Sequence, residues 1–162
     1  MKILIVSASK GNNYKLGEKL SGMLEVDHEL ISLEDYPLPL FVPGGKKPDE
    51  SVINELVSKF DEADGFIFCA PEYNAGSPPI LTNAITWITV TTKNWRDAFK
   101  NKVALIATYS GGAAYWFLSS FRDQLEYMGC TVYHRNISVH RNAEFNPESV
   151  DRILTGFKNL LK

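Results

Sequence analysis

Residues 65–78 read GFIFCAPEYNAGSP, an apolar run that passes directly into a polar turn. The continuous apolar run is typical of a strand that is buried on both faces of a parallel sheet. The turn at residues 71–78 leads into a helical pattern, and such turns lie where ligands bind in open parallel sheets. Tyr73 offers an apolar face, Asn74 an amide, and Gly76 a backbone that another group can approach closely. The turn suits a flat ligand that forms hydrogen bonds, although an ordinary surface loop has the same residue types.

The same succession of buried strand and amphipathic helix runs through the rest of the chain. The expected strands are Lys2–Val6, Glu29–Leu33, Gly65–Ala70, Val103–Thr108 and Thr131–His134. The helices between and after them have apolar residues at helical spacing, as in Leu16, Leu20 and Leu24. We therefore expect a three-layer α/β sandwich with a five-stranded parallel sheet in the order 2-1-3-4-5.

Three segments are harder to assign. The prolines of residues 36–45 forbid a helix or a central strand, so we expect a loop that is packed by its own apolar side chains. Ser77 and Pro78 resemble an N-cap and the first helical residue. Residues 89–92 are compatible with either helix or β structure.

The tryptophans and cysteines are expected to be structural. Trp87 and Trp95 are expected either to pack against the sheet or a neighbouring loop, or to face another protomer. Cys69 and Cys130 lie in apolar surroundings and have neither disulfide nor zinc spacing. The histidines also lack metal-ligand spacing, so we predict no metal site and a structural or surface role for His28, His134 and His140.

Length and charge limit the possible classes of protein. A chain of 162 residues that is 44% hydrophobic is expected to form one domain over residues 1–162. Its 17 basic and 19 acidic residues leave a net charge of −2, so neither nucleic acid nor an anionic membrane is the expected partner. No apolar run approaches the roughly 20 residues of a membrane span. We expect a cytoplasmic protein.

Three turns should meet at one edge of this sheet, because the first, third and fourth strands are neighbours. The first turn, Ser7–Asn13, resembles a phosphate cradle at a helix start, yet is neither a P-loop nor a dinucleotide fingerprint. The turn Tyr109–Gly112 offers consecutive N–H groups. Taken alone, each is also compatible with a capped helix start or a tight glycine turn; taken together they predict a mononucleotide, most naturally a flavin. The candidate cofactor-binding residues are Ser7, Ser9, Lys10, Gly11, Asn12, Asn13, Pro71, Glu72, Tyr73, Asn74, Ser110, Gly111 and Gly112.

Residues 71–87, PEYNAGSPPILTNAITW, resemble the P-E-Y-N-x-x-x-P-x-x-L-K-N-A-I-D-W segment of the NADPH-dependent FMN reductase family, which has the flavodoxin-like fold. The turn at residues 110–112, with a helix that ends at Gly129, is similar to the third flavin loop of that family. The resemblance implies FMN as cofactor, NADPH or NADH as electron donor, and a homodimer or homotetramer.

Two positions depart from the family pattern. The first loop is shorter than the usual G-S-x-R-x-x-S-x-N, and Lys10, a point charge, replaces an arginine fork. Tyr115 stands where the family often has glycine, so this side chain is expected either to cover the flavin or to obstruct a nicotinamide.

The chemistry of such an enzyme belongs to the cofactor, so no catalytic side chain is predicted. Backbone groups of residues 72–76 are expected at the ring and those of residues 110–112 at its N1 edge. The acceptor would be a quinone, an azo compound, a metal ion or free flavin. The alternative is a flavodoxin-type electron carrier, which is usually more acidic than this chain. A phospho-accepting receiver domain is disfavoured, because no acidic cluster follows the first strand.

Overall fold

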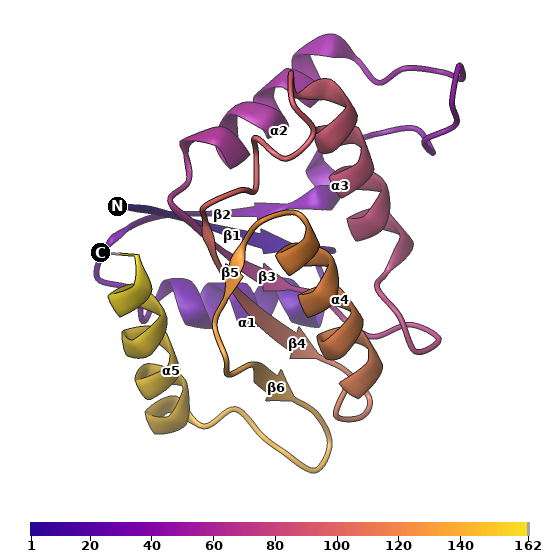
Figure 1. Cartoon of the computed structure of the whole chain (residues 1–162). Coiled ribbons are helices and arrows are strands. Elements are labelled where there is room, and N and C mark those ends of the chain that lie inside the picture. The colour runs from indigo at the N-terminus through magenta and orange to yellow at the C-terminus, as the bar shows by residue number, and fades with distance from the viewer. Residues whose placement is uncertain (162) are drawn as a thin grey trace.

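The computed structural model describes residues 1–161 as a parallel sheet with helices on both faces (Figure 1). The strands follow the order β2-β1-β3-β4-β5, with β6 also paired to β4, and every pairing is parallel. The expected sheet order is confirmed. The elements are β1 Lys2–Ser7, α1 Asn12–Ser21, β2 Asp27–Ser32, a 3-10 turn Leu33–Asp35, α2 Glu50–Glu62, β3 Gly65–Cys69, α3 Pro79–Thr91, β4 Val103–Tyr109, α4 Tyr115–Tyr127, β5 Thr131–Val132, β6 Ile137–Val139 and α5 Pro147–Leu160.

The central strands are apolar on both sides because each face of the sheet has its own core. Helices α2, α3 and α4 cover one face, where Phe66 and Phe68 of β3 pack with Phe60. Helices α1 and α5 cover the other, where Ile67 packs in a cluster with Leu16 and Phe157. Alternate residues of β3 thus enter opposite cores, which explains the unbroken apolar run.

The fifth position of the sheet is filled by two short strands. The expected strand Thr131–His134 ends at Val132, and β6, which the sequence pattern did not predict, pairs with β4 from Ala107 to Tyr109. Arg122 of α4 donates to the carbonyl oxygens of Val132 and Tyr133 at 3.3 and 2.9 Å. These side-chain bonds satisfy two backbone acceptors where the chain leaves the sheet, before it returns at β6.

Two helix boundaries differ from those expected, and the structure decides between helix and β structure for most of residues 89–92. Pro78, and not Ser77, is the N-cap of α3, with Pro79 as its first residue. Helix α1 ends at Ser21, although Leu24 still packs in the core. Residues 89–91 are helical as the last part of α3.

The loop at residues 36–45 is held by α3 more than by its own side chains. Leu40 and Val42 are 76% and 52% exposed, so the expected self-packing is wrong for them. The indole N–H of Trp87, which is buried, donates to the carbonyl oxygen of Pro39 at 2.7 Å. Trp95, by contrast, is 44% exposed. No helix in residues 1–161 is long and apolar enough to cross a membrane.

Candidate functional site

The turns after β1, β3 and β4 enclose a hollow of about 660 Å³ at the carboxyl edge of the sheet, within the size range of small-molecule sites. We call it the three-turn hollow. It is lined by Ser9, Gly11, Asn12, Asn13, Pro71, Glu72, Tyr73, Tyr109, Ser110, Gly111 and Arg141.

The first turn presents the N-terminus of α1 to this hollow. Gly11 is the N-cap and has no side chain to accept from the first N–H groups of the helix. These donors, with the positive end of the helix dipole, form an environment that favours an anion. The side chain of Asn13 bonds both the N–H and the carbonyl oxygen of Tyr109, at 2.8 and 3.0 Å. This amide fixes the first turn to the end of β4.

The second turn is a tight two-residue turn at Asn74 and Ala75. Both residues have positive φ, 49° and 60°, and Tyr73 and Gly76 exchange two backbone hydrogen bonds of 3.0 Å. The positive φ values thus belong to Asn74 and Ala75 and not to Gly76. A Cβ placed on Gly76 would meet only the carbonyl oxygen of Tyr73, at 3.8 Å. Gly76 does not line the three-turn hollow, so a close approach of the ligand to its backbone stays a prediction. Tyr73, 55% exposed, stands at the mouth of the hollow.

Glu72 joins the second turn to the third. Its N–H donates to Ser110 Oγ at 2.9 Å, and its carboxylate accepts from the N–H of Phe117, in the first turn of α4, at 2.9 Å. The N–H of Ser110 donates to the carbonyl oxygen of Val139 at 3.1 Å. The amide N–H groups of Glu72 and Ser110 are thus engaged within the protein. This network favours a rigid wall whose remaining donors lie at its glycines.

Gly111 and Gly112 leave space in front of the backbone. A Cβ at either position would meet no heavy atom within 4 Å, and neither residue has positive φ. Only Gly111 borders the three-turn hollow. A planar group can therefore approach the main chain at Gly111 without a steric obstacle.

Nine of the thirteen predicted site residues lie in the lining, and four do not. Ser7 is buried, and its hydroxyl donates to the carbonyl oxygen of Ser9 at 2.7 Å. Lys10 forms an ion pair with Asp35, whose carboxylate raises the pKa of the ammonium group. Asn74 and Gly112 are the other two outside the lining.

Two lining residues were not predicted from the sequence, Tyr109 and Arg141. Arg141 follows β6, a strand of three residues with no recognisable pattern, so only its position after a strand could have suggested it. Tyr109 belongs to the third turn, whose predicted site residues are Ser110, Gly111 and Gly112. Tyr115 is 78% exposed and does not line the hollow.

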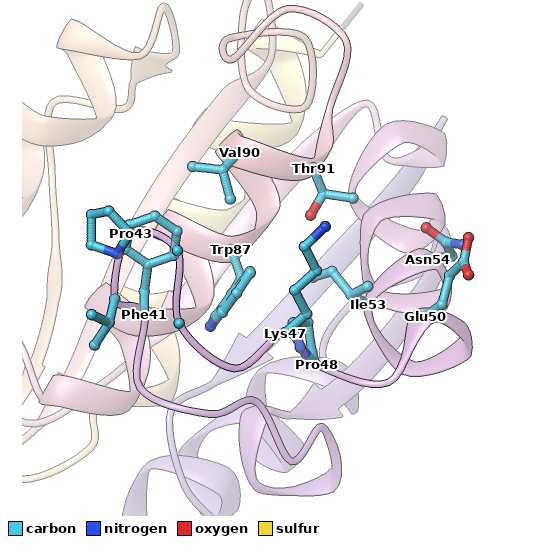
Figure 2. A pocket seen from close by; sticks show the side chains of 13 residues that line it. Phe41, Pro43, Lys47, Pro48, Glu50, Ile53, Asn54, Trp87, Val90 and Thr91 are labelled. Atoms are coloured by element: carbon cyan, nitrogen blue, oxygen red, sulfur yellow. The ribbon is translucent and has the colours of Figure 1, made fainter.

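A second hollow of about 640 Å³ lies between residues 41–48, α2 and α3 (Figure 2). Trp87 and Ile53 form part of its wall, and the side chain of Lys47 points into it toward Thr91. The nearby start of α2 is already capped, because the Asp49 carboxylate accepts from the N–H of Ser51 at 2.9 Å. This hollow therefore has no open helix start for a phosphate, unlike the three-turn hollow.

Metal and thiol chemistry have no support in the described part of the chain. Residues 1–161 contain no group of three or more His, Cys, Asp or Glu side chains that could hold a metal ion. Burial raises the pKa values of Cys69 and Cys130 to about 12, so both thiols are neutral near pH 7. The hollow thus offers positioning groups, an open helix start and a polar wall, which suit a phosphate-bearing planar cofactor.

Comparison with known proteins agrees with this geometry. Residues 1–144 match the family model described as NADPH-dependent FMN reductase. The chain is 30% identical over 129 residues to NADH-dependent flavin reductase subunit 2 of Lactobacillus johnsonii, covering 78% of this chain and 67% of that protein. It is 32% identical over 106 residues to NAD(P)H:quinone oxidoreductase of Solanum tuberosum, covering 62% of this chain and 50% of the potato protein.

Solved structures show the same fold. The flavoenzyme NAD(P)H:(acceptor) oxidoreductase FerB of Paracoccus denitrificans superposes with a TM-score of 0.76 at 18% identity, over 99% of this chain and 94% of that one. A flavodoxin from the domain Archaea superposes with a TM-score of 0.68 at 14% identity, over 99% and 96% of the two chains. The architecture is therefore flavodoxin-like.

Proposed function

Because the chain belongs to the NADPH-dependent FMN reductase family, we propose that it binds FMN in the three-turn hollow and reduces the bound flavin with NADPH or NADH. It is an oxidoreductase of the NAD(P)H-dependent FMN reductase type. The physiological acceptor we propose is a small molecule: a quinone, an azo compound, a metal ion or free flavin.

The observation that carries the proposal is the union of an uncapped helix start and an open backbone wall in one hollow. The first N–H groups of α1 suit a phosphate dianion. The main chain at Gly111 suits the polar edge of a planar ring, and Tyr73 supplies an aromatic surface at the mouth. This donor set fits FMN in both its charged and its flat parts.

The protein's own contribution is to bind, orient and shield. FMN, held by the first N–H groups of α1 and the main chain at Gly111, would supply the hydride chemistry between the nicotinamide and the acceptor. The bonds of Asn13 to Tyr109 and of Glu72 to Ser110 fix the three turns relative to one another before any ligand arrives. Such a preformed site loses little entropy on binding.

The decisive experiment is an anaerobic titration. Purified protein is loaded with FMN and titrated with NADPH and separately with NADH, while the visible flavin band is followed. We expect bleaching by at least one donor, whereas an equal concentration of free FMN stays oxidised on the same timescale. Bound flavin that neither donor bleaches would contradict the proposal and favour a flavodoxin-type carrier.

The assembly we propose is a homodimer or homotetramer. Exposed apolar side chains at Tyr115, Trp116 and Val90, with exposures of 78%, 69% and 52%, provide surface that a second copy would bury. Sedimentation velocity measures the mass directly, and a monomer at micromolar concentration would contradict this assembly.

A further inference from the structure

Arg141 lies at the tip of a tight turn that borders the three-turn hollow. The turn is closed by two backbone hydrogen bonds between His140 and Ala143, of 2.9 and 3.0 Å. It follows β6 directly, and β6 is tied to the third turn by the bond from the Ser110 N–H to the Val139 carbonyl oxygen. The Cα position of Arg141 is therefore set by the same framework that builds the hollow.

Among residues 1–161, Arg141 is the only cationic residue in the lining of this hollow. Within residues 1–161 no carboxylate forms an ion pair with its guanidinium. Lys10, the cation of the first turn, lies outside the lining and is paired with Asp35. The only carboxylate in the lining, Glu72, already accepts a hydrogen bond from α4. The available positive charge of the site is therefore that of Arg141.

The turn that carries Arg141 lies beside the uncapped start of α1. Asn12 and Tyr109 line the three-turn hollow together with Arg141, and the same two residues line a smaller hollow with Val139 and Phe145. These last two residues flank the turn on either side in sequence. Arg141 thus lines the three-turn hollow from a turn that lies near the start of α1, where the helix N–H groups are open.

We propose that Arg141 binds the 5′-phosphate of FMN together with the first N–H groups of α1, an inference that rests on the proposed function. A phosphate dianion is the ligand that matches a guanidinium fork and an uncapped helix start at once. The positive charge of the phosphate site then comes from the segment after β6 and not from the first turn.

The test compares two flavins that differ only by the phosphate. Dissociation constants of FMN and riboflavin are measured by quenching of flavin fluorescence, on protein from which flavin has been removed. We expect Arg141→Gln to weaken FMN binding on the order of tenfold or more, as for loss of a charge-assisted hydrogen bond, and to leave riboflavin binding unchanged. Arg141→Lys should keep part of the preference for FMN.

Arg135→Gln is the matched control, because Arg135 is exposed, lies in the neighbouring segment and does not line the three-turn hollow. It removes the same charge and should leave both constants unchanged. Raising the salt concentration should weaken FMN binding less in the Arg141→Gln variant than in the wild type.

Three results would overturn the proposal. FMN affinity that is unchanged in Arg141→Gln would show that the phosphate is held elsewhere. Equal losses for FMN and riboflavin would assign Arg141 to the ring or to the shape of the site. A rise in KM for NADPH alone, without a change for NADH or for FMN binding, would assign it to the 2′-phosphate of the nucleotide. Wild-type protein that binds neither flavin would instead refute the proposed function itself.

Discussion

At the scale of single residues, Glu72 connects a ligand-facing turn to the stability of a helix. Ala114, the N-cap of α4, has no side-chain cap, and the Glu72 carboxylate supplies the missing acceptor from another turn. Its negative charge also lies at the positive end of the helix dipole. The same residue therefore orders the wall of the hollow and closes the helix that follows it.

Replacing Glu72 should lower stability through α4. We expect Glu72→Ala to reduce the free energy of unfolding by about 1 kcal/mol and Glu72→Gln, which keeps an acceptor, by less. Urea denaturation of flavin-free protein measures both. Glu126→Ala, at an exposed position on the same helix, is the control and should change stability by less than about 0.5 kcal/mol. A loss in Glu72→Ala no larger than that of the control would show that the cap contributes nothing.

The two adjacent glycines of the third turn offer a matched pair of variants. Both have open space in front of the backbone, but only Gly111 borders the hollow. A leucine at position 111 should therefore fill the space that the flavin ring needs, and we expect Gly111→Leu to lower FMN affinity at least tenfold. Gly112→Leu should have little effect. Dissociation constants for FMN test this prediction. Equal effects of the two substitutions would contradict the placement of the ring against Gly111.

At the scale of elements, the loop after β2 depends on one face of α3. Asn83 accepts from the Phe41 N–H at 2.8 Å and donates to the carbonyl oxygen of Pro39 at 3.0 Å, beside the bond from Trp87. A loop with exposed apolar side chains is thereby held by polar bonds from a helix. These bonds also position one wall of the second hollow (Figure 2).

Asn83→Ala should release this loop without unfolding the sheet. We expect a loss of about 1–2 kcal/mol in the free energy of unfolding, since the side-chain hydrogen bonds to Phe41, Pro39 and Leu38 are removed at a half-buried site. Hydrogen exchange read by mass spectrometry should show faster exchange at the Phe41 amide and its neighbours. Thr82→Ala, on an exposed position of the same helix, should leave that exchange unchanged. Unaltered protection of residues 38–48 in Asn83→Ala would contradict this role.

Sequence patterns predict these elements where a single force dominates. The unbroken apolar run of β3 favours a strand buried on both faces, and the alternation of such strands with helices favours the parallel order that the sheet has. The division of the last sheet position between β5 and β6 was not predictable, because strands of two and three residues are too short to show a periodic pattern. The place of each strand depends on its tertiary pairing with β4, which local propensity does not encode.

The same distinction applies to the site. Gly11, Pro71 and Gly111 were predictable, because each lies in a turn after a strand whose end the topology brings to one edge. Lys10 lies outside the lining and pairs with Asp35, which follows the next strand, an arrangement that local sequence does not show. Arg141 was missed because it follows a strand of only three residues, whose place beside β4 depends on tertiary pairing.

At the scale of the whole molecule, one sheet separates two cores, and each core contains one buried thiol. Cys69 packs with the α1 and α5 face and Cys130 with the α2, α3 and α4 face. Desolvation raises both pKa values from 9.0 to about 12. Above pH 9, each thiol therefore keeps its proton in the folded protein but loses it in the unfolded chain.

This difference in proton binding predicts that alkali destabilises the fold from both faces of the sheet. The unfolded state binds fewer protons between pH 9 and pH 12, so the free energy of unfolding falls as pH rises through that window. Each thiol should account for about 1 kcal/mol of loss at pH 10 relative to pH 8. Urea denaturation at pH 8 and pH 10 measures this loss. Cys69→Ala and Cys130→Ala should each have a lower free energy of unfolding than the wild type at pH 8, but that free energy should fall less between pH 8 and pH 10 than it does in the wild type. Because the two thiols lie in different cores, the double variant should show the sum of the two reductions. A pH dependence identical to that of the wild type in both single variants would mean that other groups cause the alkaline loss.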